Sequence, residues 1–273
     1  MGLFNILDPA LDFIFRPLLN LGYLGFLLIM SFLISLGIIL LTKYTTNQKL
    51  MKELRDSMKS YQDQMKEHKN NPSKVLELQK KAMEQNMEYM KHSFRTTIYS
   101  FIPIIIILGW VGSSVAYLPI MPNEQFNTTL LFNKNFQGNV TIDIPNEIKL
   151  LSNKAIPIEG GRASWILKSQ KEGNYEIMFN ADHEVSSKEV LITNALKYSP
   201  VVKRKKGLID FIYGSREGYL DSTGSVQQIT LNNKFTHPIG NLSLFGWQPG
   251  WLGIYIISSI IFTMILRKFL KVY

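Results

Sequence analysis

Three long runs without charged residues constrain this chain more than any other feature of its sequence. Residues 17–42 contain no Asp, Glu, Lys or Arg, and residues 21–41 are almost wholly apolar. A second uncharged run covers residues 96–123, and a third covers residues 235–266. A helix needs roughly 20 apolar residues to cross the hydrocarbon core of a bilayer. The sequence therefore predicts a membrane protein of mainly α class, with three transmembrane helices.

We place the three membrane spans at residues 21–42, 97–118 and 247–268. Trp247 and Trp251 suit the membrane interface at the start of the third span. A secretory signal peptide is the alternative for the first span. Its apolar stretch is too long for a signal peptide, no Lys or Arg precedes Arg16, and no small-x-small cleavage site follows.

Basic residues predict the orientation in the membrane. Lys43 and Arg95 are among many Lys and Arg residues in the loop 43–96. Arg267 and Lys268 follow the apolar part of the third span, and Lys271 lies after it. Positive residues next to spans stay in the cytoplasm. We therefore expect a plasma-membrane protein with its N-terminus outside and a cytoplasmic tail at residues 269–273. The net charge of +9 suits anionic partners, either lipid headgroups or nucleic acid.

The cytoplasmic loop, residues 43–96, has the pattern of an antiparallel coiled-coil hairpin. Leu54, Met58, Tyr61 and Met65 follow one another at alternating three- and four-residue steps, as in the seam of a coiled coil. Residues 70–73 then interrupt the pattern, with Ser73 as the expected cap of a second helix over residues 74–94.

Six methionines lie on the apolar stripes of the two hairpin helices: Met51, Met58, Met65, Met83, Met87 and Met90. Unbranched thioether side chains can fill the seam between the helices. They can also form a pliable surface that contacts varied hydrophobic segments or a ribosome. The Lys and Arg residues of the hairpin are open to two interpretations as well, either a solvated helix surface or a contact with ribosomal RNA or acidic lipid.

The segment between the second and third spans changes to a β pattern. Short β-rich runs at residues 128–132, 139–144, 164–168, 175–179 and 189–193 predict an immunoglobulin-like β-sandwich over residues 119–202. Residues 203–246 form a connector that either lies flat on the outer leaflet or packs against the sandwich. Residues 1–20 are expected at the outer interface, because residues 11–19 form a possible amphipathic segment.

Weakly polar residues recur on one face of each span. They are Asn20, Ser31, Ser35 and Thr42 in the first span, Thr96 and Ser100 in the second, and Tyr255, Ser259 and Thr263 in the third. Such stripes suit a hydrophilic groove open to the cytoplasm, with Lys43 at its mouth and Arg95 as a second candidate for the charge. Ordinary helix packing explains Ser and Thr equally well, and snorkelling explains either cation.

Enzyme signatures are missing from the sequence. It has no cysteine, and its four histidines are scattered without ligand spacing. It contains no HExxH, GxSxG or Walker-type loop, and no Asp or Glu lies within the spans. We therefore expect no catalysis, no metal site and no cofactor.

The assembled layout resembles the Oxa/YidC membrane-protein insertase superfamily, in particular its archaeal three-helix branch related to the third subunit of the endoplasmic-reticulum membrane protein complex. The matching residues are 40–48 (LLTKYTTNQ), which run into the charged hairpin, and 250–255 (GWLGIY), which open the third span. The resemblance implies a hydrophilic groove and nascent membrane proteins as partners, with further small membrane subunits possible. Bacterial members carry an arginine within the first core helix, and residues 21–41 contain none here.

The resemblance predicts an insertase that helps hydrophobic helices with short translocated tails to enter the bilayer. One alternative is a structural or sensory protein whose outer β domain binds a ligand or an envelope partner. Another is an ion-conducting oligomer, which would need the acidic pore residues that the spans lack.

The orientation can be tested by single-cysteine labelling, because the natural chain has no cysteine. A membrane-impermeant maleimide should label Lys69→Cys only after the membrane is permeabilised. A cysteine in the β segment, Asn139→Cys, is the control and should react in intact cells. Labelling of Lys69→Cys in intact cells would reverse the predicted topology.

Overall fold

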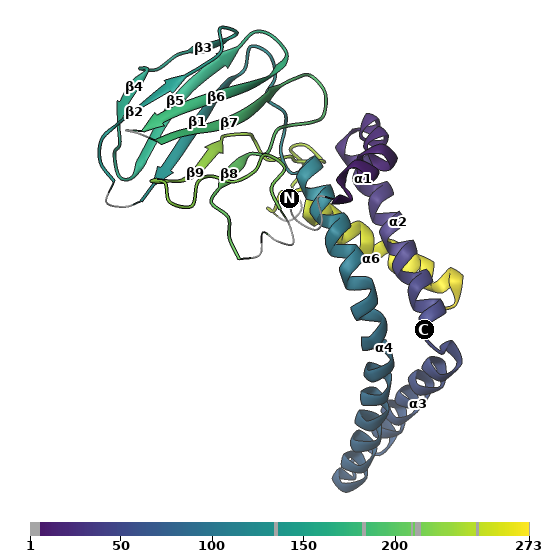
Figure 1. Cartoon of the computed structure of the whole chain (residues 1–273). Coiled ribbons are helices and arrows are strands. Elements are labelled where there is room, and N and C mark those ends of the chain that lie inside the picture. The colour runs from purple at the N-terminus through teal and green to yellow at the C-terminus, as the bar shows by residue number, and fades with distance from the viewer. Residues whose placement is uncertain are drawn as a thin grey trace. The chain divides into compact units, whose positions relative to one another are not determined.

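The computed structural model describes residues 6–133, 136–181, 184–208, 210, 214–243 and 246–272, apart from the side chains of residues 95 and 96. The chain forms two compact units. The first unit comprises Met1–Phe26 and Gly109–Trp251, and the second comprises Leu27–Leu108 and Leu252–Tyr273. Figure 1 labels the elements of both units.

In the part of the chain that the structure describes, three helices are long and apolar enough to cross a membrane. These stretches are Asp8–Thr45, Thr97–Val115 and Trp251–Leu270, in agreement with the three spans expected from the sequence. The first contains helix α2 (Gly22–Thr45), the second is the end of helix α4 (Pro72–Val115), and the third is helix α6 (Trp251–Leu270). The chain is therefore built around apolar helices whose backbone groups are paired within each helix, as hydrocarbon requires.

Helix α4 is one continuous helix that contains both the predicted second hairpin helix and the second span. It has 44 residues and continues through Pro103, so it extends over about 66 Å at 1.5 Å per residue. It begins at Pro72, where the side chain of Asn71 accepts a hydrogen bond from the backbone N–H of Lys74 at 3.2 Å. Ser73, which we expected to cap this helix, instead lies in its first turn, because proline is well tolerated at that position and Asn71 supplies the cap.

Helix α3 (Gln48–Glu67) precedes α4 and is joined to it by a short turn. The side chain of Asn47 caps α3 by accepting a hydrogen bond from the N–H of Leu50 at 3.2 Å. In the turn, the N–H of Asn71 donates to the carbonyl of His68 at 2.8 Å, and the chain reverses there (Figure 1). The loop 43–96 thus contains a helical hairpin, and its coiled-coil character stays a prediction.

The first unit begins with two short helices, α1 (Asp8–Phe15) and the 3-10 helix η2 (Arg16–Leu21). The indole N–H of Trp110, near the end of α4, donates to the Asp12 carboxylate at 2.8 Å. The ring of Trp110 also lies 5.9 Å from that of Phe15 and 6.1 Å from that of Phe26. The N-terminal helices are therefore fixed to the end of α4 by a buried tryptophan.

The rest of the first unit is an antiparallel β region with two sheets (Figure 1). The five-stranded sheet has the order β3 (Ile148–Leu150), β5 (Arg162–Ser169), β1 (Gln125–Phe132), β9 (Val226–Leu231) and β8 (Val202–Arg204). The four-stranded sheet has the order β4 (Ala155–Pro157), β2 (Asn139–Asp143), β6 (Gly173–Ala181) and β7 (Glu184–Ile192). The five expected strands coincide with β1, β2, β5, β6 and β7.

One hydrophobic core serves both sheets. Trp165 of β5 and Phe179 of β6 are fully buried, with their ring centroids 5.5 Å apart. Alternation along the strands produces this core, because every second residue of β1 and β5 is buried. The immunoglobulin-like assignment itself stays a prediction.

The β region extends beyond the boundary that we expected at residue 202. Strands β8 and β9, from the predicted connector, pair with each other, and β9 also pairs with β1 in the same sheet. The basic cluster at residues 203–206 is held by partners in this region. The ammonium of Lys203 donates to the Ser187 carbonyl at 2.8 Å, and Arg204 pairs with Asp210 at 2.7 Å. Residues 209 and 211–213 of this connector, for which both a place on the leaflet and packing against the sandwich were open, lie outside the described residues.

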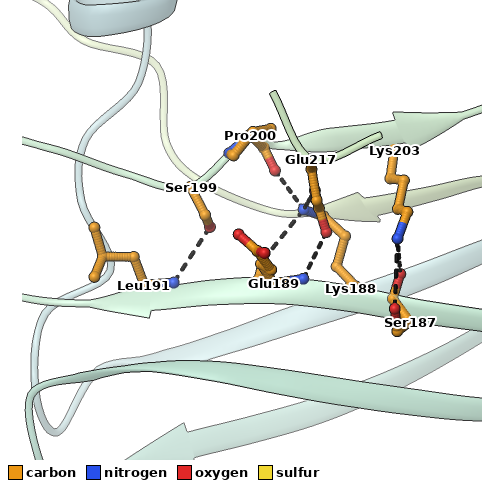
Figure 2. Close-up of polar contacts among 8 residues, drawn as sticks. All are labelled: Ser187, Lys188, Glu189, Leu191, Ser199, Pro200, Lys203 and Glu217. Atoms are coloured by element: carbon orange, nitrogen blue, oxygen red, sulfur yellow. Dashed lines mark hydrogen bonds and ion pairs between the residues drawn. The ribbon is translucent and has the colours of Figure 1, made fainter. Parts of the chain in front are cut away.

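A buried ion pair fastens the segment after β8 to strand β7 (Figure 2). The side chains of Lys188 and Glu217 are 0% and 1% exposed, and Lys188 also donates to the carbonyls of Pro200 and Glu189. Glu217 accepts from the N–H of Glu189 as well. Burial lowers the pKa of Lys188, although the neighbouring Glu217 carboxylate opposes that shift. The pair therefore depends on both partners being present.

Removing one partner of this pair should destabilise the β region strongly. Glu217→Gln leaves a buried ammonium without its carboxylate and should lower the free energy of unfolding by about 3 kcal/mol. Thermal unfolding followed by circular dichroism of the full chain in detergent would measure this. Lys154→Gln is the control, because the Lys154–Asp143 pair is exposed, and it should cost less than about 1 kcal/mol. Equal effects of the two variants would contradict a structural role for the buried pair.

Candidate functional site

The polar residues of α2 and α6 form a helix–helix contact in the second unit. The hydroxyl oxygens of Ser258 and Ser31 lie 2.8 Å apart. Ser31 donates to the carbonyl of Leu27 in its own helix, and the Ser258 hydroxyl also lies 2.7 Å from the carbonyl oxygen of Ile254. Ser35 donates to the carbonyl of Ser259 at 3.4 Å. Ser31, Ser35 and Ser258 are almost completely buried. In the described chain, these serines therefore pair with groups of the protein itself.

Aromatic packing supports the same contact. Phe32 of α2 and Phe262 of α6 meet edge to face, with centroids 5.6 Å apart. Tyr255, which we expected in the groove, is buried next to Ser258 on α6. Ser31, Ser35 and Tyr255 are thus buried at this contact, as small and weakly polar residues often are where two apolar helices approach closely, and their role in a groove stays a prediction.

The side chains of the other predicted groove residues take no part in this contact among the described residues. Thr42 is half-buried and donates to the Ile38 carbonyl at 2.8 Å, while Lys43 is exposed in the last turn of α2. Thr263 is half-buried on α6. Ser100 is buried and donates to the Thr97 carbonyl at 3.1 Å. The side chains of Thr96 and Arg95 lie outside the described part of the chain.

Asn20 lies in a different place from the other predicted groove residues. It belongs to η2 in the first unit, before α2 begins, and it is exposed. The regular 100° spacing that grouped it with Ser31 does not apply there, since Gly22 has a φ of 77° and ends the 3-10 helix. Asn20 is thus separated from the face of α2 that carries Ser31 and Ser35.

The hairpin methionines divide into two groups. On α3, Met51 is almost fully buried, and Met58 and Met65 are half-buried. On α4, Met83 and Met87 are 62% and 66% exposed, and Met90 is 54% exposed. Of the two interpretations of the methionines, filling the seam fits the α3 group, whereas the exposed side chains of the α4 group fit a contact surface. Leu78 is the buried apolar residue of that part of α4, and Val75 and Ala82 are half-buried.

The exposed methionines belong to a longer apolar face of α4, which we call the α4 stripe. It consists of residues that are each more than half exposed and recur at steps of mostly three or four: Leu76, Met83, Met87, Met90, Phe94, Ile98, Phe101 and Ile102. At about 100° per residue these positions fall on one side of the helix. From Met83 onward the stripe is continuous from the hairpin into the membrane span, while Lys80 separates Leu76 from the rest of it.

Charged residues beside the stripe keep the hairpin helix soluble. Glu77 forms ion pairs with Lys74 at 2.8 Å and with Lys81 at 2.7 Å. These two ammonium groups lower the pKa of Glu77 to about 2, so the carboxylate stays ionised at neutral pH. The paired charges leave the apolar face itself free of carboxylates and available for contact.

Sequence reasoning missed Ser258 and the exposure of the α4 methionines. Ser258 directly precedes Ser259, so the choice between them depends on the rotation of α6 against α2, which one sequence does not give. The sequence contains a weak indication that Met83 and Met87 are exposed. Val75, Leu78 and Ala82 form a second apolar stripe on α4, and this stripe is an alternative candidate for the seam.

The three apolar helices define an integral membrane protein, and a comparison with protein families identifies its class. Residues 6–147 match the family described as integral membrane protein EMC3/TMCO1-like. This match covers slightly more than half of the chain, so the chain belongs to that family, which is part of the Oxa1/YidC/EMC3 insertase superfamily. No match was found among curated proteins or among solved structures.

The matched residues include α1, α2, the helical hairpin and all of α4. They end within the β region, so most of the β strands and α6 lie beyond the match. The family is of the membrane-insertase type and not a family of catalytic enzymes. The predicted resemblance is confirmed at the level of the superfamily.

The serine contact makes a prediction about helix packing. Ser258→Ala removes the interhelical hydrogen bond and should lower the free energy of unfolding by about 1 kcal/mol, measured by denaturant titration in mixed micelles. Ser259→Ala is the matched control, because its hydroxyl donates to the Ile256 carbonyl of its own helix. A Ser258→Ala variant as stable as this control would argue against the contact.

Proposed function

We propose that this protein is a membrane-protein insertase that receives hydrophobic segments on the α4 stripe and guides them into the bilayer. The observation that carries the proposal is the continuity of the stripe, which joins a charged hairpin to a membrane span in a member of the EMC3/TMCO1-like family. Nascent membrane proteins with short translocated tails are the proposed clients.

The stripe has the properties that a transient hydrophobic contact needs. Methionine side chains are flexible and polarizable, so they adapt to clients of different shape. Each apolar Å² that a client buries against Met83, Met87 or Phe94 is worth roughly 25 cal/mol, and the same gain is available further along the helix in lipid. A client can therefore move along α4 without a large barrier, and the transfer needs no nucleotide.

A polar path for the translocated tail is the second part of the proposal. Because Ser31 and Ser35 are buried in the contact between α2 and α6, we assign such a path to the less buried Thr42, Lys43, Ser259 and Thr263. We assign Lys43, exposed at the end of α2, the role of attracting acidic or polar tail residues. Its ammonium replaces, at a shallower position, the arginine that bacterial members carry.

The setting of this activity follows from the charge pattern. We propose that the hairpin acts as an antiparallel coiled coil in the cytoplasm, that the N-terminus and the β region are outside the plasma membrane, and that the chain belongs to the archaeal three-helix branch. Ribosomes, anionic lipids and small membrane subunits are proposed as additional partners of the basic hairpin. A purely sensory role is less favoured, since α4 returns to an apolar span instead of ending in the cytoplasm.

Site-specific photocrosslinking tests the α4 stripe. A photoreactive amino acid at Met87 should crosslink to a short-tailed membrane protein during its translation. The same probe at Glu88 is the control, because that residue is also exposed and lies next in sequence but is turned away from the stripe. Crosslinks of equal yield at both positions, or unchanged insertion when Met83, Met87 and Met90 are all replaced by Gln, would contradict the proposal.

A further inference from the structure

We propose that the first unit contains a binding site for the headgroup of an anionic phospholipid, at the point where the chain enters its first membrane helix. The site is a cavity of about 470 Å³ between η2 and the loop that follows β7. This volume is within the range of pockets that hold small ligands. The inference concerns a lipid ligand and goes beyond the proposed insertase activity.

The polar lining of the cavity suits a phosphate group. Arg16 and Asn20 contribute from η2, and Asn194 and Lys197 contribute from the loop. Two cations and two amides offer charge and several N–H donors, whereas none of the described lining residues carries a carboxylate. An anion that binds here is therefore favoured over a cation or a neutral solute.

The nearby acids leave this charge only partly compensated. Asp12 pairs with one nitrogen of the Arg16 guanidinium at 3.3 Å, so the other nitrogens of that fork can still donate. Glu172 accepts a hydrogen bond from the amide of Asn194 and so fixes that side chain in place. Lys197 is exposed and has no carboxylate partner among the described residues. The cavity thus combines one oriented guanidinium with one uncompensated ammonium.

The apolar surroundings point to a lipid and not to free phosphate. Leu19, Leu196, Gly22 and Ala195 complete the lining. Leu21 at the end of η2 and Leu24 at the start of α2 follow in sequence, and their side chains are 59% and 38% exposed. An acyl chain attached to a bound headgroup can lie on these leucines. The exposed Phe13 of α1 is a further apolar side chain next to the site in sequence, as expected where a chain meets a bilayer surface.

Native mass spectrometry of the full chain in detergent micelles tests the site, with dioleoyl-phosphatidylglycerol and dioleoyl-phosphatidylcholine as probes. The anionic lipid should bind in preference to the zwitterionic one. Lys197→Gln should weaken that binding about fivefold, the usual effect of one cation near an anionic lipid. Arg16→Gln should act in the same direction. Lys206→Gln is the matched control, because Lys206 is an exposed lysine of the same unit and does not line the cavity.

Three outcomes would overturn the proposal. Equal loss in Lys197→Gln and Lys206→Gln would mean a diffuse surface attraction. Equal binding of the two lipids would mean that the cavity does not distinguish an anionic headgroup from a zwitterionic one. Displacement of the lipid by glycerol 3-phosphate at equal concentration would mean that the apolar surroundings contribute nothing and that the ligand is a soluble phosphate. Lys197→Gln lies in an exposed loop, so folding does not limit the test.

Discussion

Hydrocarbon offers no hydrogen-bond partners, and this constraint governs the second unit of the protein. Backbone groups are paired inside α2, α4 and α6, and the few polar side chains of these helices need partners too. The hydroxyls of Ser31 and Ser258 are hydrogen-bonded to each other, while those of Thr42 and Ser100 donate to backbone carbonyls of their own helices. Hydroxyls that suggested a wet groove therefore serve in part to hold two helices together.

The same constraint explains why the α4 stripe is informative. An apolar face in water costs free energy, yet Met83, Met87 and Met90 are left uncovered by the rest of the described chain. Val75 and Leu78, on another face of the same helix, are half-buried and buried instead. A face that the hairpin does not bury for its own stability is free to bind another molecule.

The β region is under a different constraint, because the edge strands of its sheets have unpaired backbone N–H and C=O groups. Strand β7 ends the four-stranded sheet, and side chains of the following segment occupy its free N–H groups. Glu217 accepts from Glu189, and Ser199 accepts from Leu191 at 3.2 Å (Figure 2). The buried Lys188 anchors that segment. An edge covered in this way cannot pair with the strand of another chain.

The sequence alone determined the three apolar helices, the helical hairpin and the five main strands, because hydrophobic length and periodicity are local properties. It also carried the membership of the insertase superfamily. Only the tertiary structure decided the rotation of the helices about their axes, which buries Ser31 and exposes Met87. It also decided the pairing of β9 with β1 and of Lys188 with Glu217, since contacts between distant segments depend on packing that local patterns do not record.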